Sequence, residues 1–255
     1  LYDMAQAGVA LHLGCAVTGV EKTAQGFAVQ TTKGSFHAAS LIIATGGKSI
    51  PKMGATGFGY QIAEQFGVPL VETRPGLVPL TFAEQELRWM QPLAGVSLQA
   101  RVACDRTRFD EAVLFTHRGL SGPAVLQISS YWREGEAIGL NLLPDQDVAA
   151  LLRQAKKDNG RAALRTALAR MLPEKLARHV EAAAGLTAPM AEFPTAALER
   201  VARMISDWRL VPVGSEGYRT AEVTFGGVDT DALDARSMMV KAVPGLFFVG
   251  EVVDV

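Results

Sequence analysis

A short apolar run that ends in adjacent glycines constrains the fold of this chain more than any other feature. Residues 41–51 read LIIATGGKSIP, so the apolar residues 41–44 run directly into Thr45, Gly46 and Gly47. A strand that is apolar on both faces is typical of the centre of a parallel sheet. Ligands of doubly wound folds bind at the carboxyl ends of such strands, where glycine lets them approach the backbone. The run therefore predicts either a strand end beside a ligand or a tight turn without one.

The Gly47-Lys48-Ser49 sequence also invites comparison with the phosphate-binding loop of nucleotide hydrolases. That motif requires a second glycine five positions before the glycine that precedes the lysine. Ile42 occupies the corresponding position here. The spacing therefore excludes a phosphate-binding loop of this type.

Composition places the chain among ordinary globular proteins. It has 255 residues, 49% of them hydrophobic and 20% charged, with a net charge of −1. A chain of this length can bury a substantial core in one large domain or two smaller ones. Cys15 and Cys104 match neither a zinc motif nor a disulfide framework. We expect a cytoplasmic protein with reduced thiols, without a metal site or a membrane-spanning segment.

The pattern of hydrophobic residues changes three times along the chain. Residues 1–72 combine alternating segments with an amphipathic helix over about 58–66, which is typical of an α/β unit. Residues 73–145 contain short strand-like runs separated by glycine and proline. Apolar residues recur at helical spacing over 146–217, and strand-like runs return over 218–255. We therefore predict an α/β domain interrupted by an inserted α+β unit, with a β-rich part and a helical part.

A second strand end resembles the first. The apolar run GLFFV leads into Gly250 and Glu251, and Asp254 follows. A carboxylate at this position can accept hydrogen bonds from the hydroxyl groups of a nucleotide cofactor, or it can simply be solvated. From the residues alone, a strand end beside a nucleotide cofactor and a strand end followed by solvated carboxylates both remain open.

The segment FTHRGLSGP, residues 115–123, resembles the Gly-x-Ser-x-Gly elbow of serine hydrolases. Its fifth position is Pro123 rather than glycine, and no acid is placed to support His117. The alternatives are a structured loop between two strands and a loop that faces a substrate. Under the second alternative, Thr116 and His117 are the candidate catalytic groups.

The helical region is much more basic than the whole chain. Residues 151–180 contain eight Lys and Arg against two Asp and Glu, a net charge of +6. Such asymmetry indicates either a phosphate-binding surface or the solvated faces of amphipathic helices. Both interpretations remain open from the sequence.

Five segments in this order resemble a known family, the BaiN/YhiN-like bacterial flavoproteins, which include aminoacetone oxidase-like members. The segments are LIIATGGKSIPKMGATGFGYQIAEQFG, GLVPLTF, LFTHRGLSGPAVLQIS, GYRTAEVTFGGVDT and PGLFFVGEVVDV. The resemblance covers nearly the whole chain. It implies a doubly wound FAD-binding domain, formed by residues 1–72 and 218–255, that is interrupted by an insertion with a β-barrel-like part and a helical part.

The resemblance also implies roles for individual residues. Ala44, Thr45, Gly46 and Gly47 would pass beside FAD, and the backbone of Val17 would meet its adenine. The final FAD-binding segment would contribute Gly250, Glu251 and Asp254.

The chain departs from the family pattern at both ends. The Gly-x-Gly-x-x-Gly fingerprint that holds the pyrophosphate is absent, as is the family's glycine-rich continuation after GEVVDV. We therefore expect a fragment that binds FAD weakly or not at all by itself and is inactive alone.

The resemblance implies an FAD-dependent oxidoreductase in the intact protein. It would transfer hydride to a small organic substrate, with NAD(P)H as a possible electron donor. The alternative is a flavin-fold protein that binds or modifies RNA through residues 151–180. The oligomeric state, the substrate and the catalytic residues are not determined by the sequence.

Overall fold

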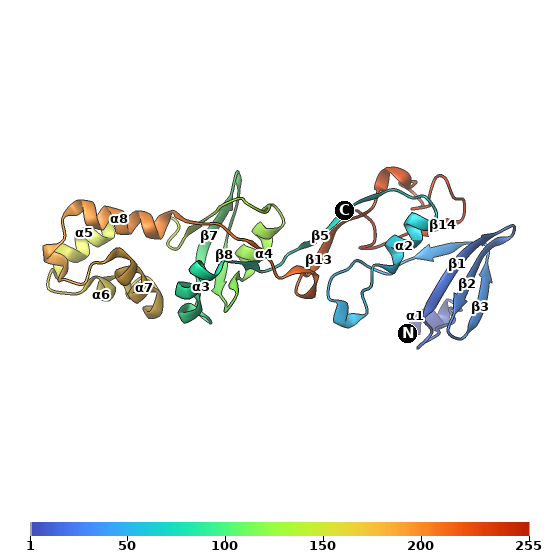
Figure 1. The fold of residues 1–255 in the computed structure, drawn as a ribbon, viewed down its shortest axis with the longest axis horizontal. Coiled ribbons are helices and arrows are strands. Elements are labelled where there is room, and N and C mark those ends of the chain that lie inside the picture. The colour runs from blue at the N-terminus through green and yellow to red at the C-terminus, as the bar shows by residue number, and fades with distance from the viewer. Residues whose placement is uncertain (1, 255) are drawn as a thin grey trace. The chain divides into compact units, whose positions relative to one another are not determined.

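The computed structural model describes residues 2–254, which divide into two compact units. One unit contains residues 2–48, 55–73 and 225–254, and the other contains 49–54 and 74–224. Each unit has its own cluster of buried hydrophobic residues. Figure 1 shows the helices and strands of both units.

The first unit combines a three-stranded sheet with a helix and a parallel strand pair. The helix α1 (Tyr2–Gln6) precedes an antiparallel sheet in the order β1-β2-β3. The remaining elements are β4, α2, the 3-10 helix η5 and β14. The bounds are β1 Val17–Thr23, β2 Gly26–Thr31, β3 Gly34–Ala38, β4 Leu41–Ile43, α2 Phe58–Gln65, η5 Thr230–Ala232 and β14 Leu246–Phe248.

The apolar run of residues 41–44 contains a parallel strand, but this strand is not a central one. β4 pairs with β14 in parallel, and this sheet has two strands. Ile43 is buried, whereas the side chain of Ile42 on the opposite face is 61% exposed. The prediction of a strand covered on both faces is therefore wrong for the described residues, because only one face of β4 packs on the core.

Two longer strands pair with each other where the chain enters and leaves the second unit. They are β5 (Leu70–Gly76) and β13 (Val223–Val228), which form a two-stranded sheet.

The second unit begins with a seven-stranded sheet in which every pair of neighbouring strands is antiparallel. The strand order is β11-β10-β7-β8-β9-β6-β12. The hairpin of β7 and β8 supplies its longest strands. The bounds are β6 Leu80–Thr81, β7 Ser97–Cys104, β8 Thr107–Phe115, β9 Gly119–Ser121, β10 Ile138–Asn141, β11 Trp208–Leu210 and β12 Gly214–Ser215.

Helices interrupt this sheet where the sequence predicted mainly strands. α3 (Glu84–Met90) follows β6, and α4 (Pro123–Ser129) follows β9. The run PAVLQIS is therefore helical and not a strand. Four of its residues are buried, because the short helix packs against β7 and β8. The second unit also contains the 3-10 helices η1 Pro51–Met53, η2 Gln91–Leu93, η3 Met190–Glu192 and η4 Gly217–Arg219.

The helical part contains the four amphipathic helices that the sequence predicts (Figure 1). They are α5 Val148–Asp158, α6 Leu164–Leu168, α7 Glu174–Ala184 and α8 Thr195–Ser206. α5 packs against α8, and α6 packs against α7. Their buried faces join the hydrophobic cluster of the seven-stranded sheet. None of the helices in the described residues is long and apolar enough to span a membrane.

Candidate functional site

The two glycine-containing segments begin side by side at one edge of the first unit. In the β4–β14 pair Leu41 lies opposite Leu246, and Ile43 lies opposite Phe248. The backbone N–H of Val249 donates to the carbonyl of Ile43 at 3.0 Å, which extends the ladder beyond β14. Because parallel strands end at the same edge, the segments 44–47 and 249–254 both leave from it. We call this place the glycine edge.

Helix α2 packs its first turn against the glycine edge through Gly59. A Cβ atom on Gly59 would lie 2.3 Å from Oγ1 of Thr45 and 2.8 Å from Cγ2 of Val252. No real side chain tolerates such distances, so α2 can approach this closely only with glycine. Gly59 therefore holds the two segments against one helix, and the sequence analysis had not identified it.

The segment after β14 is also held from its other side. The carbonyl of Val252 accepts from the N–H of Val228 at 2.9 Å, and the N–H of Asp254 donates to the carbonyl of Val228 at 3.0 Å. Val252 and Val253 are buried, whereas Glu251 is exposed. The two hydrogen bonds fix the backbone that places Glu251 and Asp254 at the glycine edge.

Gly46 and Gly250 leave open space at this edge. Their φ angles are +73° and +79°, which side-chain-bearing residues rarely adopt, and no atom lies within 4 Å of an added Cβ. A ligand can therefore approach both backbones, while Ala44 and Thr45 are exposed beside them. This geometry fits a nucleotide cofactor that lies along the strand ends, such as a flavin.

Lys48 is a second residue near this edge whose contacts the sequence did not reveal. Its Nζ donates to Oγ1 of Thr73 at 2.7 Å and lies 5.2 Å from the centre of the Tyr60 ring. In the sequence, Lys48 belongs to a Gly-Lys-Ser segment that resembles a phosphate-binding loop but lacks the required glycine at position 42. The observed contacts hold the ammonium group between β5 and α2.

Val17 lies in a different part of the same unit. It is the first residue of β1, whose sheet bonds to α2 through Gln65 Nε2 and the carbonyl of Val20, 2.6 Å apart. Nζ of Lys22 donates to the carbonyl of Pro244 at 2.6 Å. Gln65 and Pro244 lie at the ends of α2 and β14 that are opposite the glycine edge. No contact in the described residues brings Val17 to the glycine edge.

Thr116 and His117 belong to the second unit, where Thr116 shapes a turn. Its Oγ1 accepts hydrogen bonds from the N–H groups of Arg118 and Gly119 at 3.2 and 3.1 Å. The His117 side chain is exposed, and its carbonyl accepts from Nε2 of Gln91 at 3.4 Å. The observed hydrogen bonds of Thr116 are structural.

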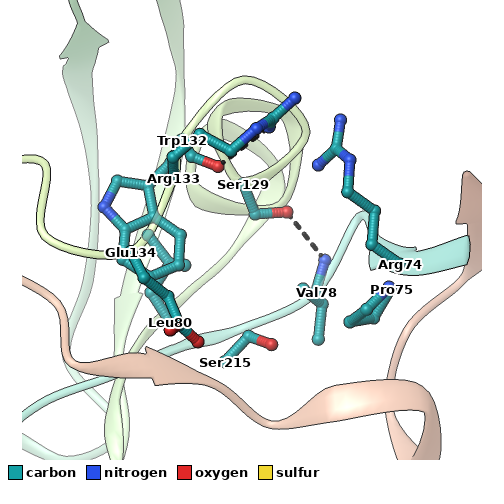
Figure 2. A pocket seen from close by; sticks show the side chains of 9 residues that line it. All are labelled: Arg74, Pro75, Val78, Leu80, Ser129, Trp132, Arg133, Glu134 and Ser215. Carbon is teal, nitrogen blue, oxygen red and sulfur yellow. Dashed lines mark hydrogen bonds between the residues drawn. The ribbon is translucent and has the colours of Figure 1, made fainter. Parts of the chain in front are cut away.

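A hollow of about 150 Å³ lies beside the end of α4 in the second unit (Figure 2). Its two guanidinium groups bond to carbonyl oxygens near that helix end: Arg74 to Ser130 at 2.8 Å, and Arg133 to Trp132 at 3.1 Å. Burial, and then the charge of Arg133, lowers the pKa of Arg74. The two guanidinium groups thus bind carbonyl oxygens just after α4, which gives both arginines of the hollow a structural role.

The basic residues of the helical part are only partly paired. Glu181 neutralises Arg165, Glu174 pairs with Arg178, and Nζ of Lys156 donates to the carbonyl of Phe193. Within residues 151–180, four further basic side chains are exposed, namely Lys157, Arg161, Arg170 and Lys175. The surface of the helical part is therefore positively charged in places, as the sequence indicated.

Comparison with known proteins identifies the class to which this chain belongs. Residues 74–223 match the family model described as the HI0933-like protein barrel and H2TH domain. These residues make up more than half of the chain and nearly all of the second unit. The chain belongs to the HI0933-like family.

Named relatives extend the similarity over the first unit as well. The ribosomal RNA dihydrouridine synthase of Escherichia coli strain K12 is 43% identical over 100% of this chain and 64% of its own length. The Haemophilus influenzae protein of the same name is 42% identical over 90% of the chain and 57% of its length. The 3-dehydro-bile acid delta(4,6)-reductase of Clostridium scindens is 26% identical over 97% of the chain and 64% of its length. The chain thus spans less than two thirds of these relatives.

Proposed function

We propose that this chain is part of a flavin-dependent reductase that forms dihydrouridine in ribosomal RNA. The observation that carries the proposal is 43% identity, over the whole chain, to an enzyme named for that reaction. The intact protein would add hydrogen across the C5–C6 double bond of a uracil base, which is conjugated with the C4 carbonyl. An RNA-modifying protein was the alternative that the basic helical part suggested.

The glycine edge supports the flavin part of this proposal. Residues 1–72 and 218–255 would belong to a doubly wound FAD-binding domain, and 73–145 and 146–217 would form its insertion. Ala44, Thr45, Gly46 and Gly47 would lie along FAD from one side. Gly250, Glu251 and Asp254 would lie along it from the other, with Val17 toward the adenine. When bound, FAD would supply the hydride, and NAD(P)H is the proposed electron donor.

The residues of the chain would position the cofactor rather than react with it. The Cβ-free backbones of Gly46 and Gly250 allow main-chain approach, and Gly59 keeps both segments against α2. The carboxylates of Glu251 and Asp254 would accept hydrogen bonds from cofactor hydroxyl groups. We assign no proton donor, although Thr116 and His117 remain candidates for the substrate side.

The bile acid reductase supports a second candidate function, the reduction of a small organic substrate. Its name describes a bile acid with a keto group at position 3 and double bonds at positions 4 and 6. Its reaction therefore also concerns a carbon–carbon double bond conjugated with a carbonyl. The two candidates therefore share their chemistry and differ in the substrate. The higher identity to the RNA enzymes favours RNA.

A chimera would test the function directly. The segment of the Escherichia coli enzyme that aligns with this chain is replaced by this chain, and the chimera is expressed in a strain that lacks the enzyme. We expect dihydrouridine to return to the ribosomal RNA, as measured by mass spectrometry of nucleosides. A folded, flavin-containing chimera that forms no dihydrouridine would contradict the proposal.

A matched pair of variants separates the cofactor from the fold. Gly250→Leu in the chimera should lose the flavin absorbance, because the side chain would fill the space beside the strand end. Gly135→Leu is the control, since Gly135 has a similar φ of +89° and equally open surroundings in the second unit. Equal flavin content in the two variants would argue against the glycine edge.

A further inference from the structure

Three aromatic rings from three separate elements stack together in the second unit. Trp89 of α3 lies 4.9 Å from the ring of His179 on α7 and 4.7 Å from that of Trp208 on β11. The planes meet at 23° and 19°, so the rings are stacked. All three are partly exposed. The glycine edge and its proposed chemistry do not involve this cluster.

Trp89 and His179 line a hollow of about 470 Å³ that has an apolar floor and a basic rim. Pro92 and Leu93 complete the floor. The cations of the lining are Arg88, Lys175 and Arg178. The rim thus combines positive charge with aromatic surface, which is the combination that binds unpaired nucleic acid.

The carboxylates that pair with two of these cations are solvent-exposed. Glu84 pairs with Arg88 at 3.3 Å, and Glu174 pairs with Arg178. Exposed ion pairs one helical turn apart contribute little free energy. A phosphate group can therefore compete for Arg88 and Arg178, and Lys175 lines the same hollow.

A second hollow continues the basic surface along α7. It has a volume of about 240 Å³ and is lined by Arg165, Thr166, Ala169, Glu174 and Arg178. Because Arg178 lines both hollows, they adjoin each other. A strand of alternating bases and phosphates could cross from one to the other.

His179 is suited to the aromatic role. Burial lowers the pKa of its imidazole, which favours the neutral ring at neutral pH. A neutral ring stacked on tryptophan extends an apolar platform instead of adding a fourth cation.

We propose that this surface binds an unpaired segment of RNA, with a base against Trp89 and His179 and phosphates on Arg88, Lys175 and Arg178. The inference rests on the proposed function, because it assigns to the second unit the recognition of the RNA that the enzyme would reduce. Base–aromatic stacking holds RNA with little dependence on sequence. The surface would therefore position the RNA, while other contacts select the uridine.

The charge of the rim is tested by the salt dependence of RNA binding. The probe is a single-stranded oligouridylate of about twelve nucleotides, and binding to the chain is measured by fluorescence anisotropy at several salt concentrations. Arg88→Ala/Lys175→Ala should lower the slope of log affinity against log salt by about 1.4, or about 0.7 for each phosphate contact. Arg106→Ala/Arg108→Ala, at exposed positions of the β7–β8 hairpin, should leave the slope unchanged.

The stacking is tested by comparing RNA with a backbone that carries no bases. The wild-type chain should prefer oligouridylate to an abasic sugar-phosphate chain by about tenfold or more, as expected for one stacked base. Trp89→Leu should lose this preference, whereas Trp89→Phe should keep most of it. Thermal melts of both variants are the control for folding.

The results separate this inference from the proposed reaction. Unchanged slope in Arg88→Ala/Lys175→Ala, or equal binding of RNA and the abasic chain by the wild type, would overturn the RNA surface even if the chimera forms dihydrouridine. Binding as expected with a chimera that forms no dihydrouridine would support the surface and contradict the reaction.

Discussion

Glu181 on α7 caps the beginning of α6 by accepting a hydrogen bond from the backbone N–H of Arg165 at 2.9 Å. Its second oxygen lies 3.2 Å from the Arg165 guanidinium. The first turn of a helix has N–H groups without helical partners, and the N-cap residue here, Ala163, has no side chain that could accept from them. A glutamate that is only 5% exposed therefore replaces the usual capping residue from a neighbouring helix.

Removal of this cap should destabilise the second unit. Glu181→Ala leaves the Arg165 N–H without its acceptor in a partly buried setting, which should lower the free energy of unfolding by about 1–3 kcal/mol. Glu181→Gln keeps one acceptor and should cost less. Urea unfolding followed by circular dichroism measures both values. The control is Glu174→Ala, because Glu174 pairs with Arg178 on the exposed surface and should contribute less than about 1 kcal/mol.

Gly59→Ala should disturb the glycine edge. The new Cβ would collide with Thr45 and Val252, so α2 would have to move away, at a cost of about 1–3 kcal/mol. In the chimera, flavin content should fall together with stability. Gln61→Ala, at an exposed position of the same helix, is the control. Wild-type flavin content and stability in Gly59→Ala would contradict the observed packing.

The helices over 148–206 could be predicted because apolar residues recur at helical spacing through this region. α4 could not, since its seven residues include a mostly apolar run that is equally compatible with a buried strand. Pro123 at its first position was the available signal for a helix start. Pro194 is the N-cap of α8, which begins at Thr195.

The candidate site was predictable only where its residues carry a local signal. The strand ends at Gly46 and Gly250 follow apolar runs, and the structure brings them to one edge. Gly59 matters only because of what packs against it, which no local pattern reveals. The charge count over 151–180 also omitted Glu181, one residue beyond that range, which neutralises Arg165. Contacts between residues that are distant in the sequence therefore could not be predicted from local sequence patterns.

Ser129 should contribute more stability than an ordinary surface serine. Its Oγ accepts from the N–H of Val78 at 3.0 Å (Figure 2). The same Oγ donates to the carbonyl of Leu126 at 2.7 Å. Ser129→Ala would leave the buried Val78 N–H without an acceptor, which should cost about 1–3 kcal/mol. Ser206→Ala is the control, because the Ser206 hydroxyl only donates to the carbonyl of Ala202 in its own helix. Equal unfolding free energies for the two variants would count against this role of Ser129.

The burial of His179 should make the stability of the second unit depend on pH. The folded pKa is lower than the ordinary value of 6.5, because burial disfavours the charged imidazole. As pH falls through about 6.5, the unfolded chain binds a proton that the folded chain does not. The free energy of unfolding should therefore decrease as pH falls from about 7 toward the folded pKa. The cations Lys175 and Arg178 line the same hollow as His179.

His179→Phe keeps an aromatic ring against Trp89 and should flatten this part of the profile. His117→Phe removes an exposed histidine and retains His179, so it should keep the wild-type decline. Urea unfolding at a series of pH values gives the three profiles, and parallel profiles for wild type and His179→Phe would show that the His179 proton is not responsible.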